Sequence, residues 1–139
     1  DISYMKIIRN LESAPIWFSE PVLISSGWLP GHSTDYNCVK IAEEYRIDKI
    51  INLSNIDYVY SNDPLENHDA KKYERLCWDD YLKLITNEWN PGLSTPFDPI
   101  ASYEAKKLGF EVAIINGIRL EEIDNFLSGK KFIGKLLHI

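Results

Sequence analysis

The stretch that most constrains how this chain can fold is KIINLSNIDYVYSNDP, which runs from residue 49 to residue 64. Its first part is apolar, and Ile50, Ile51 and Leu53 are typical of a buried strand. Its second part is a polar loop. Ligands of open parallel α/β sheets bind in the crevice outside the carboxyl ends of the strands. The stretch therefore predicts a strand followed by a ligand-binding loop, although clusters of Asn and Asp are also common in ordinary turns.

The polar loop carries groups that suit a nucleotide. Hydroxyl, amide and carboxylate groups that can hold a sugar or a phosphate come from Ser54, Asn55, Asp57 and Asp63. Tyr60 adds a flat aromatic face on which a base can stack. Taken alone, the loop favours a nucleotide site and a simple strand exit about equally, because the same residues form Asx turns.

Patterns typical of strands and helices alternate along the rest of the chain. Strands are expected at residues 21–25, 47–53, 111–116 and 132–139, and helices at residues 2–11, 33–45, 78–85, 99–108 and 120–127. Residues 21–53 then form one βαβ unit, which is expected to be right-handed and parallel. Residues 70–76 are ambiguous, with a short extended piece as the expectation. This order predicts a single α/β domain over residues 1–139 with a mainly parallel sheet.

Composition and charge exclude several classes of protein. The chain has 139 residues with 15 Lys and Arg against 21 Asp and Glu, giving a net charge of −6, and no large basic cluster for a nucleic-acid backbone. No apolar run approaches the length of a membrane span. Cys38 and Cys77 are far apart, which favours a reduced, cytoplasmic protein over a disulfide scaffold. None of the three histidines has metal-ligand spacing with a cysteine, so no protein-built metal site is predicted.

A second polar loop, SSGWLPGHSTD, lies between the first expected strand and the next helix. Gly27 and Gly31 allow a ligand to approach the backbone closely. Ser33 and Thr34 can donate hydrogen bonds to phosphate oxygens at the helix start, and Asp35 can hold a lysine or a hydrated Mg²⁺. A plain N-cap is the commoner use of such residues, by roughly two to one.

The third polar loop is TPFDPIAS, residues 95–102. Asp98 precedes Pro99, which is favoured at the first position of a helix, so Asp98 is either an N-cap or part of a site. If the assumed topology holds, all three polar loops meet at one edge of the sheet. This convergence is the strongest argument for a site that comes from the residues themselves.

The three loops together resemble those of the amino acid kinase superfamily, and most of all its archaeal-type uridylate (UMP) kinases. SGWLPGHSTD is similar to the family's Gly-Gly…Pro-Gly-x-[ST]-Thr-Asp loop, and INLSNIDYVYSNDP to its Leu-Thr-Asn-Val-Asp-Gly-Val-Tyr…Asp-Pro stretch. STPFDPIAS and the segment from residue 104 to residue 134 are similar to its closing helix–strand–helix–strand block. The resemblance extends from Val22 onward and covers the C-terminal, ATP-side portion of the family's domain.

The resemblance implies a carbamate-kinase-like three-layer αβα sandwich and phosphorylation of UMP by ATP with Mg²⁺. It places Ser54, Asn55, Asp57, Tyr60 and Asp63 in the ATP pocket. It also places Gly27, Gly31, Ser33 and Thr34 on the acceptor side, with Asp35 as the carboxylate that organises phosphoryl transfer. Partners implied are the two nucleotides and further copies of the chain, with a hexamer as the common form.

The sequence departs from the family pattern at several points. Tyr58 stands where the family has glycine, Ser26 replaces the first of two glycines, and Lys135 follows Gly134 where threonine is usual. The family's N-terminal strand and Lys-x-Gly-Gly loop have no counterpart in these residues. Two alternatives therefore remain beside a UMP kinase: a catalytically silent nucleotide-binding or assembly module, and a sister kinase with another acceptor.

Overall fold

The computed structural model of the chain describes residues 2–4, 6–10, 17–60, 68–69, 71–73, 75–87 and 95–139. Within them, helices and strands follow one another in an α/β order. In chain order these are α1 (Thr34–Glu44), β1 (Lys49–Ser54), β2 (Val59–Tyr60), β3 (Lys72–Tyr73), β4 (Arg75–Cys77), α2 (Trp78–Asn87), α3 (Pro99–Leu108), β5 (Glu111–Asn116), α4 (Leu120–Leu127) and β6 (Lys135–His138).

The central sheet has the strand order β1-β5-β6-β4. β1 and β5 run parallel, with Lys49 opposite Glu111 and Ser54 opposite Asn116, and β4 runs parallel to β6. β5 and β6 are antiparallel. Two of the three pairings in this sheet are thus parallel, which confirms the predicted mainly parallel sheet. The antiparallel pair arises because the chain after α4 returns to the start of that helix, where the Ile133 N–H donates to Glu122, before β6 begins.

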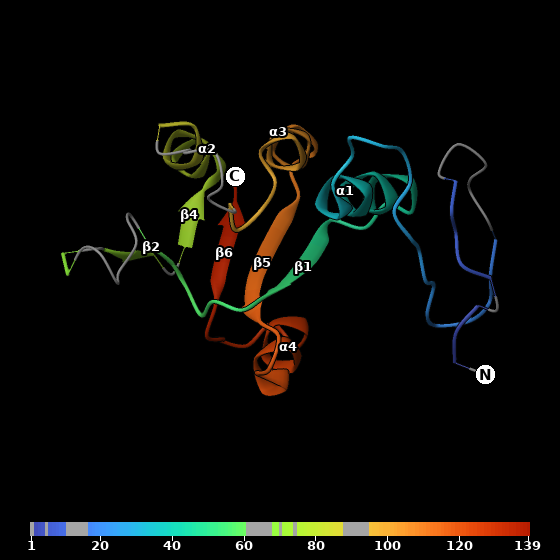
Figure 1. Ribbon diagram of the computed structural model, residues 1–139. Coiled ribbons are helices and arrows are strands. Elements are labelled where there is room, and N and C mark those ends of the chain that lie inside the picture. Colours follow the sequence, from blue (N-terminus) through green and yellow to red (C-terminus); the bar gives the residue numbers. More distant parts are fainter. Residues whose placement is uncertain are drawn as a thin grey trace.

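Figure 1 shows three layers, with α1, α2 and α3 on one face of the sheet and α4 on the other. β5 explains why both faces are covered. Val112 and Ile114 pack in the core beneath α1, α2 and α3, whereas Ala113 and Ile115 pack with Phe126 of α4. A strand buried on both faces reads as a continuous apolar run, and EVAIIN is such a run. The predicted αβα sandwich is confirmed.

The helix ends follow from local sequence. Ser33 caps α1, accepting a hydrogen bond from the Tyr36 N–H at 3.1 Å. Asp98 caps α3 in the same way, through the Ala101 N–H at 2.8 Å, with Pro99 in the first turn. Gly109 ends α3 with a φ of 74°, a left-handed conformation that glycine adopts without a steric penalty. The bounds predicted for these two helices are confirmed to within a residue.

The prediction for the N-terminal residues is wrong. Instead of a helix over residues 2–11, Ser3 and Ile8 form isolated parallel bridges with Val22 and Ser25, and residues 11–16 lie outside the described part. Of the apolar positions at helical spacing, Ile8 is buried but Ile2 is 76% exposed, so a helix here would have had no apolar face to bury. Pairing with residues 22–26 satisfies the backbone instead.

The same pairing overturns the predicted βαβ unit over residues 21–53. Residues 22–25 bridge to residues 3–8, and in the described sheet β1 pairs with β5. The ambiguous residues 70–76 do contain extended chain, because β3 pairs with β2 and β4 joins the edge of the central sheet. Both Cys38 and Cys77 are free thiols. None of the described helices has the length and apolar character needed to cross a membrane.

Candidate functional site

The carboxyl ends of β1 and β5 lie side by side, since Ser54 is opposite Asn116 in the parallel register. The first turns of α1 and α3 meet at the same edge. Asp35, in the first turn of α1, accepts hydrogen bonds from the Asn52 side-chain amide at 3.3 Å and from the Asp98 backbone N–H at 2.9 Å. One carboxylate therefore joins three polar segments that are far apart in sequence, and the expected convergence is present.

Burial of its side chain raises the pKa of Asp35 above the ordinary value. The hydrogen bond from the Asp98 N–H opposes this shift, and the Asp98 carboxylate adds to it through like-charge repulsion. Two carboxylates close enough to repel one another form a place where a cation is favoured. The described ranges hold no cluster of three or more His, Cys, Asp or Glu that could bind a metal ion by itself, at this edge or elsewhere.

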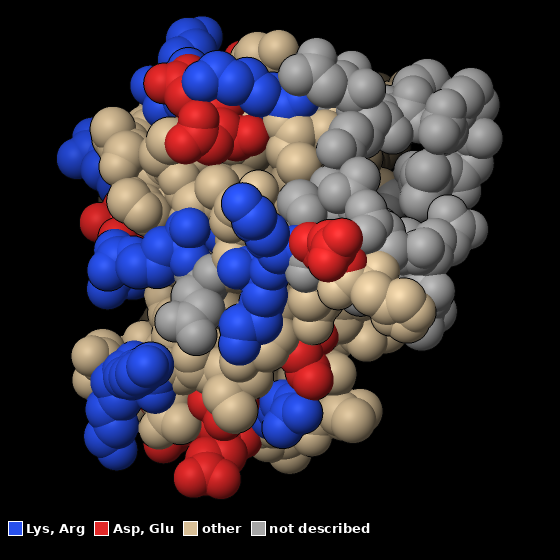
Figure 2. All heavy atoms as spheres, turned by 90° about the vertical axis from the view of Figure 1, so that its left-hand side faces the viewer, with Lys and Arg blue, Asp and Glu red and all other residues tan. Residues whose placement is uncertain are grey.

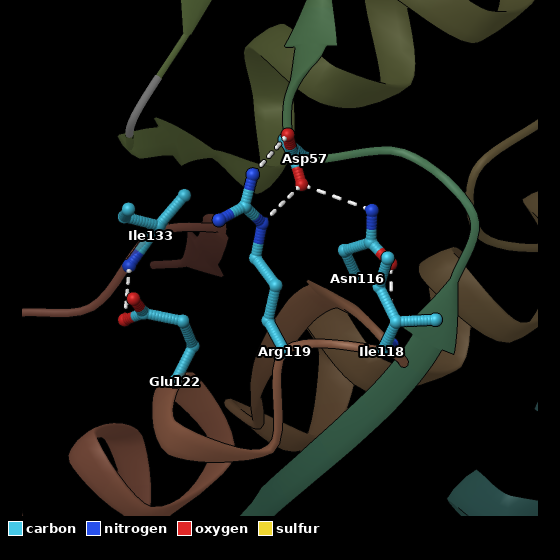
Figure 3. A network of polar contacts seen from close by, with 6 residues as sticks. All are labelled: Asp57, Asn116, Ile118, Arg119, Glu122 and Ile133. Atoms are coloured by element: carbon cyan, nitrogen blue, oxygen red, sulfur yellow. Dashed lines mark hydrogen bonds and ion pairs between the residues drawn. The ribbon is translucent and has the colours of Figure 1, made fainter.

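A second network fixes the loop that follows β1 (Figure 3). Arg119 binds both carboxylate oxygens of Asp57, with Nε–Oδ1 and Nη2–Oδ2 distances of 2.8 and 2.9 Å. The Asn116 side-chain amide donates to the same carboxylate at 3.0 Å. Arg119 first, and Asn116 second, hold the pKa of Asp57 below its ordinary value. A two-pronged Arg–carboxylate pair is directional as well as favourable, so it sets the position of the loop.

The loop is also held through its backbone. The Gly117 N–H donates to the Ser54 carbonyl at 2.9 Å, and the Ile118 N–H donates to the Asn116 side chain at 3.2 Å. The first of these bonds fastens the turn after β5 to the exit of β1, and the second closes that turn on itself. These contacts engage Asp57 in positioning the loop, while its predicted role as an ATP ligand stays a prediction.

Other predicted residues keep their polar groups available. In the part of the chain that the structure describes, the side chains of Thr34, Ser54 and Asn55 make no hydrogen bond, and Thr34 and Asn55 are exposed. Gly27 and Gly31 face open space, and Gly31 has a φ of +86°, which favours glycine. The structure thus separates residues that build the site, such as Asp35, from residues free to meet a ligand.

The remaining predicted residues differ in what the structure shows of them. Ser33 is engaged as the N-cap of α1. Tyr60 is half-buried in β2, and Asp63 lies outside the described residues. Tyr58, which stands in the place of a glycine, is absent from the described residues with positive φ, and the Lys72 ammonium lies 3.8 Å from its ring centre. The tyrosine therefore fits the loop without a left-handed backbone.

Three residues at this edge were not predicted: Asn52, Asn116 and Arg119. Asn52 could have been found from the sequence. Side chains alternate between the two faces of a strand, so the polar Asn52 lies on the same, core-facing side of β1 as Ile50. Asn116 ends β5 as Ser54 ends β1, and so follows the rule that found the first loop. Arg119 has no such signal, because its partner Asp57 is 62 residues away in the chain.

Comparison with known proteins adds the family. A model described as the amino acid kinase family matches residues 7–116, which include α1, the loop after β1 and α3. The chain belongs to the amino acid kinase family. The match ends at Asn116, so it contains Asp35, Asn52, Asp57 and Asp98 of this family member but not the following turn with Gly117, Ile118 and Arg119.

Relatives within the amino acid kinase family include uridylate kinases of archaea. The uridylate kinase of Sulfurisphaera tokodaii is 33% identical over 99% of this chain, and that of Pyrobaculum arsenaticum is 29% identical over 92%. The crystal structure of uridylate kinase from Archaeoglobus fulgidus matches 98% of the chain with a TM-score of 0.76 and 25% identity. This chain spans 62%, 59% and 61% of the length of those three proteins, respectively.

The Arg119–Asp57 pair gives a direct test of loop positioning in this amino acid kinase family member. Replacing Arg119 with glutamine is expected to speed amide hydrogen exchange at residues 55–59 several-fold, while global stability changes little because the pair is accessible to solvent. Arg119→Lys keeps the positive charge but cannot bind both carboxylate oxygens at once, so it should give an intermediate rate of amide hydrogen exchange.

Acid should reproduce the effect in the unchanged chain. A carboxyl whose folded-state pKa is lowered contributes stability above its unfolded pKa and loses it as the pH falls through the lowered value. Loop protection should therefore persist at pH 3.8, the ordinary pKa of Asp57, and disappear below it. Exchange rates equal in Arg119→Gln and the unchanged chain at neutral pH would show that the pair does not position the loop.

Proposed function

We propose that this chain is the ATP-side portion of a uridylate kinase, which transfers the γ-phosphoryl group of ATP to UMP. The observation that carries the proposal is the meeting of Asp35 of α1 with Asn52 of β1 and Asp98 of α3, at the edge where β1 and β5 end. The uridylate kinases that align with nearly the whole chain support the choice of acceptor.

The available side chains suit the two nucleotides. Ser54 and Asn55 stand free at the exit of β1 for the ATP side, where Tyr60 and Asp63 are the further predicted contacts. Gly27, Gly31 and Thr34 precede or open α1 for the acceptor side, with backbone N–H groups at a helix start that favour phosphate. Asp57 contributes through the position that Arg119 imposes on the loop.

Mg²⁺ belongs to the proposal because of how it is usually held. It binds through one or two carboxylates together with the phosphates of the substrate, rather than through a cage made only of protein. Asp35 and Asp98 supply two neighbouring carboxylates, which fits that mode. When bound, Mg²⁺ neutralises charge on the phosphates. Asp35 and its hydrogen bonds keep the starts of α1 and α3 in place, and phosphoryl transfer depends mainly on such positioning.

Assembly and location complete the proposal: a homo-oligomer, with a hexamer as the expected form, in the cytoplasm. The N-terminal segment offers apolar surface for such contacts, since Trp17 is 90% exposed and Val22 and Ile24 are also exposed. Exposed apolar residues that lie close together are typical of interaction surfaces. Light scattering after size exclusion should give a mass several times 16.1 kDa. A monomer at micromolar concentration would contradict the oligomer.

Two substitutions separate the two nucleotide sides. We expect Asn55→Ala to weaken Mg·ATP binding by about tenfold and to leave UMP binding within about twofold, because a hydrogen bond to a charged group is worth about 1.5 kcal/mol or more. Thr34→Ala should do the reverse. Isothermal titration calorimetry with each nucleotide measures both effects, and each variant serves as the control for the other.

The two variants also discriminate between proposals. Loss of UMP binding with Asn55→Ala and loss of ATP binding with Thr34→Ala would show that Asn55 contacts UMP and Thr34 contacts ATP. Binding of Mg·ATP with no binding of UMP would contradict the acceptor side proposed for Gly27, Gly31 and Thr34 and favour a nucleotide-binding module or a fragment. A second acceptor that displaces UMP would identify a sister kinase instead.

A further inference from the structure

A hollow of about 470 Å³ lies on the face of the sheet that α4 covers, away from the site described above. The chain that returns from α4 to β6 forms one wall, and the first residues of β1 and β5 form another. Its lining residues are Lys49, Arg75, Glu111, Phe126, Gly129, Lys130, Lys131, Phe132, Gly134 and Leu136. The volume is within the range of small-molecule sites.

The floor of this hollow is apolar and aromatic. The rings of Phe126 and Phe132 meet edge to face with their centres 5.1 Å apart. Leu136 of β6 packs in the same core cluster beneath α4. An aromatic floor of this kind offers a flat ring a surface on which it can pack.

The rim is basic. Four of the lining residues are cationic, namely Lys49, Arg75, Lys130 and Lys131, and Glu111 is the one acid among the lining residues that the structure describes. Figure 2 shows Lys and Arg side chains over the middle and lower part of the face that carries β4, with acidic groups above, beside and below them. This concentration contrasts with the net charge of −6 of the whole chain.

These four cations outnumber the single acid among the described lining residues, Glu111. In the described ranges none of them makes an ion pair, whereas Lys40, Lys83, Lys106 and Arg119 each have a carboxylate partner. Like charges that converge without a partner raise the local potential and attract an anion.

The C-terminus of α4 accounts for only two of the four cations that line the hollow. Lys130 and Lys131 follow the C-terminus of that helix, where cations are favoured by a partial charge of about −0.5. Lys49 and Arg75 come from β1 and β4, so the C-terminus of α4 does not account for them. Four full charges from three separate parts of the chain exceed what one helix end requires.

We propose that this hollow binds a phosphate ester that carries an aromatic ring, the class to which nucleotides belong. The basic rim would hold the phosphate, and the Phe126–Phe132 floor would pack against the ring. None of the residues predicted for ATP or UMP lines the hollow. Lys49 begins β1 and Ser54 ends it, so the Lys49 end of the hollow is separated from the end of β1 by roughly 16 Å of strand at about 3.3 Å per residue.

Backbone amide chemical shifts of Gly129 and Gly134 report on this hollow directly, because both residues line it. The probes are phenyl phosphate, UMP and inorganic phosphate, each titrated into the 139-residue chain. Phenyl phosphate and UMP are expected to give saturable shifts at both glycines, at lower concentration than inorganic phosphate of similar charge. The shift at Gly129 distinguishes this site from binding at the ends of β1 and β5, because Gly134 precedes β6 beside Ile114, close to that edge.

A matched pair of double substitutions tests the charges. Lys130→Gln with Lys131→Gln should weaken phenyl phosphate binding at this site by about tenfold, since each lost charge contact at an exposed position contributes modestly. Lys106→Gln with Lys107→Gln removes the same charge from α3 and should change it by less than about twofold. Lys107, Lys130 and Lys131 are exposed and Lys106 is half-exposed in an ion pair with Asp79, so circular dichroism checks that both variants keep the fold.

Each remaining outcome would overturn the proposal. Unchanged Gly129 and Gly134 amides at millimolar probe would show that the hollow does not bind this class. Equal affinity for inorganic phosphate and phenyl phosphate would remove the role of the ring. Equal weakening by the two double substitutions would show attraction to overall charge rather than to this site.

Discussion

Replacing Asp35 with alanine is expected to lower the free energy of unfolding by about 2 kcal/mol, because the Asp98 N–H and the Asn52 amide both lose their acceptor in a half-buried place. The starts of α1 and α3 should then separate more readily. Urea unfolding followed by circular dichroism measures the change. In a chain that also phosphorylates UMP, the same substitution should reduce turnover.

Two controls make the Asp35 result specific. Asp48→Ala removes an exposed carboxylate just before β1 and should change stability by less than about 0.5 kcal/mol. The pKa of Asp35 is raised, so the folded chain binds its proton more readily than the unfolded chain does. The stability of the unchanged chain relative to Asp35→Ala should therefore increase as the pH falls through the raised pKa toward 3.8. Equal stabilities at every pH would contradict this account.

Replacing Lys135 with methionine is expected to stabilise the chain by up to about 3 kcal/mol at neutral pH. Lys135 is fully buried at the start of β6, and its ammonium has no hydrogen-bond partner in the described structure, with the Tyr73 ring centre 5.1 Å away. Burial lowers the pKa of Lys135 from 10.5 to about 8, which corresponds to a cost of that size for the charged form. Methionine fills a similar volume without a charge.

The pH dependence of the Lys135 effect has a definite sign. Between pH 8 and pH 10.5 the unfolded chain keeps the lysine proton that the folded chain has lost, so the stability of the unchanged chain should rise with pH. The advantage of Lys135→Met should therefore shrink across that range. Lys107→Met, at an exposed position on α3, should have little effect. A methionine variant that is less stable at neutral pH would show that the ammonium has a stabilising role.

Elements defined by strong local signals could be predicted from the sequence. Ser33, Asp98 with Pro99, and Gly109 each mark a helix end by residue type alone, and these ends lie where they were expected. The apolar run of β5 similarly indicated a strand buried on both faces. Such signals act within a few residues, so tertiary context did not override them.

Residues 2–10 show where local reasoning fails. Ile2 and Ile8 fit helical spacing, but whether a helix forms depends on a surface to bury its apolar face. The hydrogen bonds that Tyr4 and Ile8 make with residues 22–24 decided the outcome. Pairing between segments that are separated in sequence is not encoded in either segment alone. The antiparallel placement of β6 is a similar case, because it follows from the path of the chain around α4.

The site was partly within reach of the same reasoning. The rule that polar loops meet at the carboxyl ends of parallel strands places Asp35, Asp98 and the Ser54 loop at one edge of the sheet from sequence alone. The rule could not say which carboxylates would already be engaged. Asp57 is bound by Arg119, a residue that no local pattern connects with it, and this long-range pair adds a positioning role to its predicted role as an ATP ligand.

The central claim is that a nucleotide binds where β1 and β5 end. Titration of Mg·ATP into the chain, followed by backbone amide chemical shifts, tests it most directly. The account predicts saturable shifts at Asn55 and Gly117, which flank that edge, and a much weaker response in Asn55→Ala. Unchanged Asn55 and Gly117 amides at saturating Mg·ATP would contradict it.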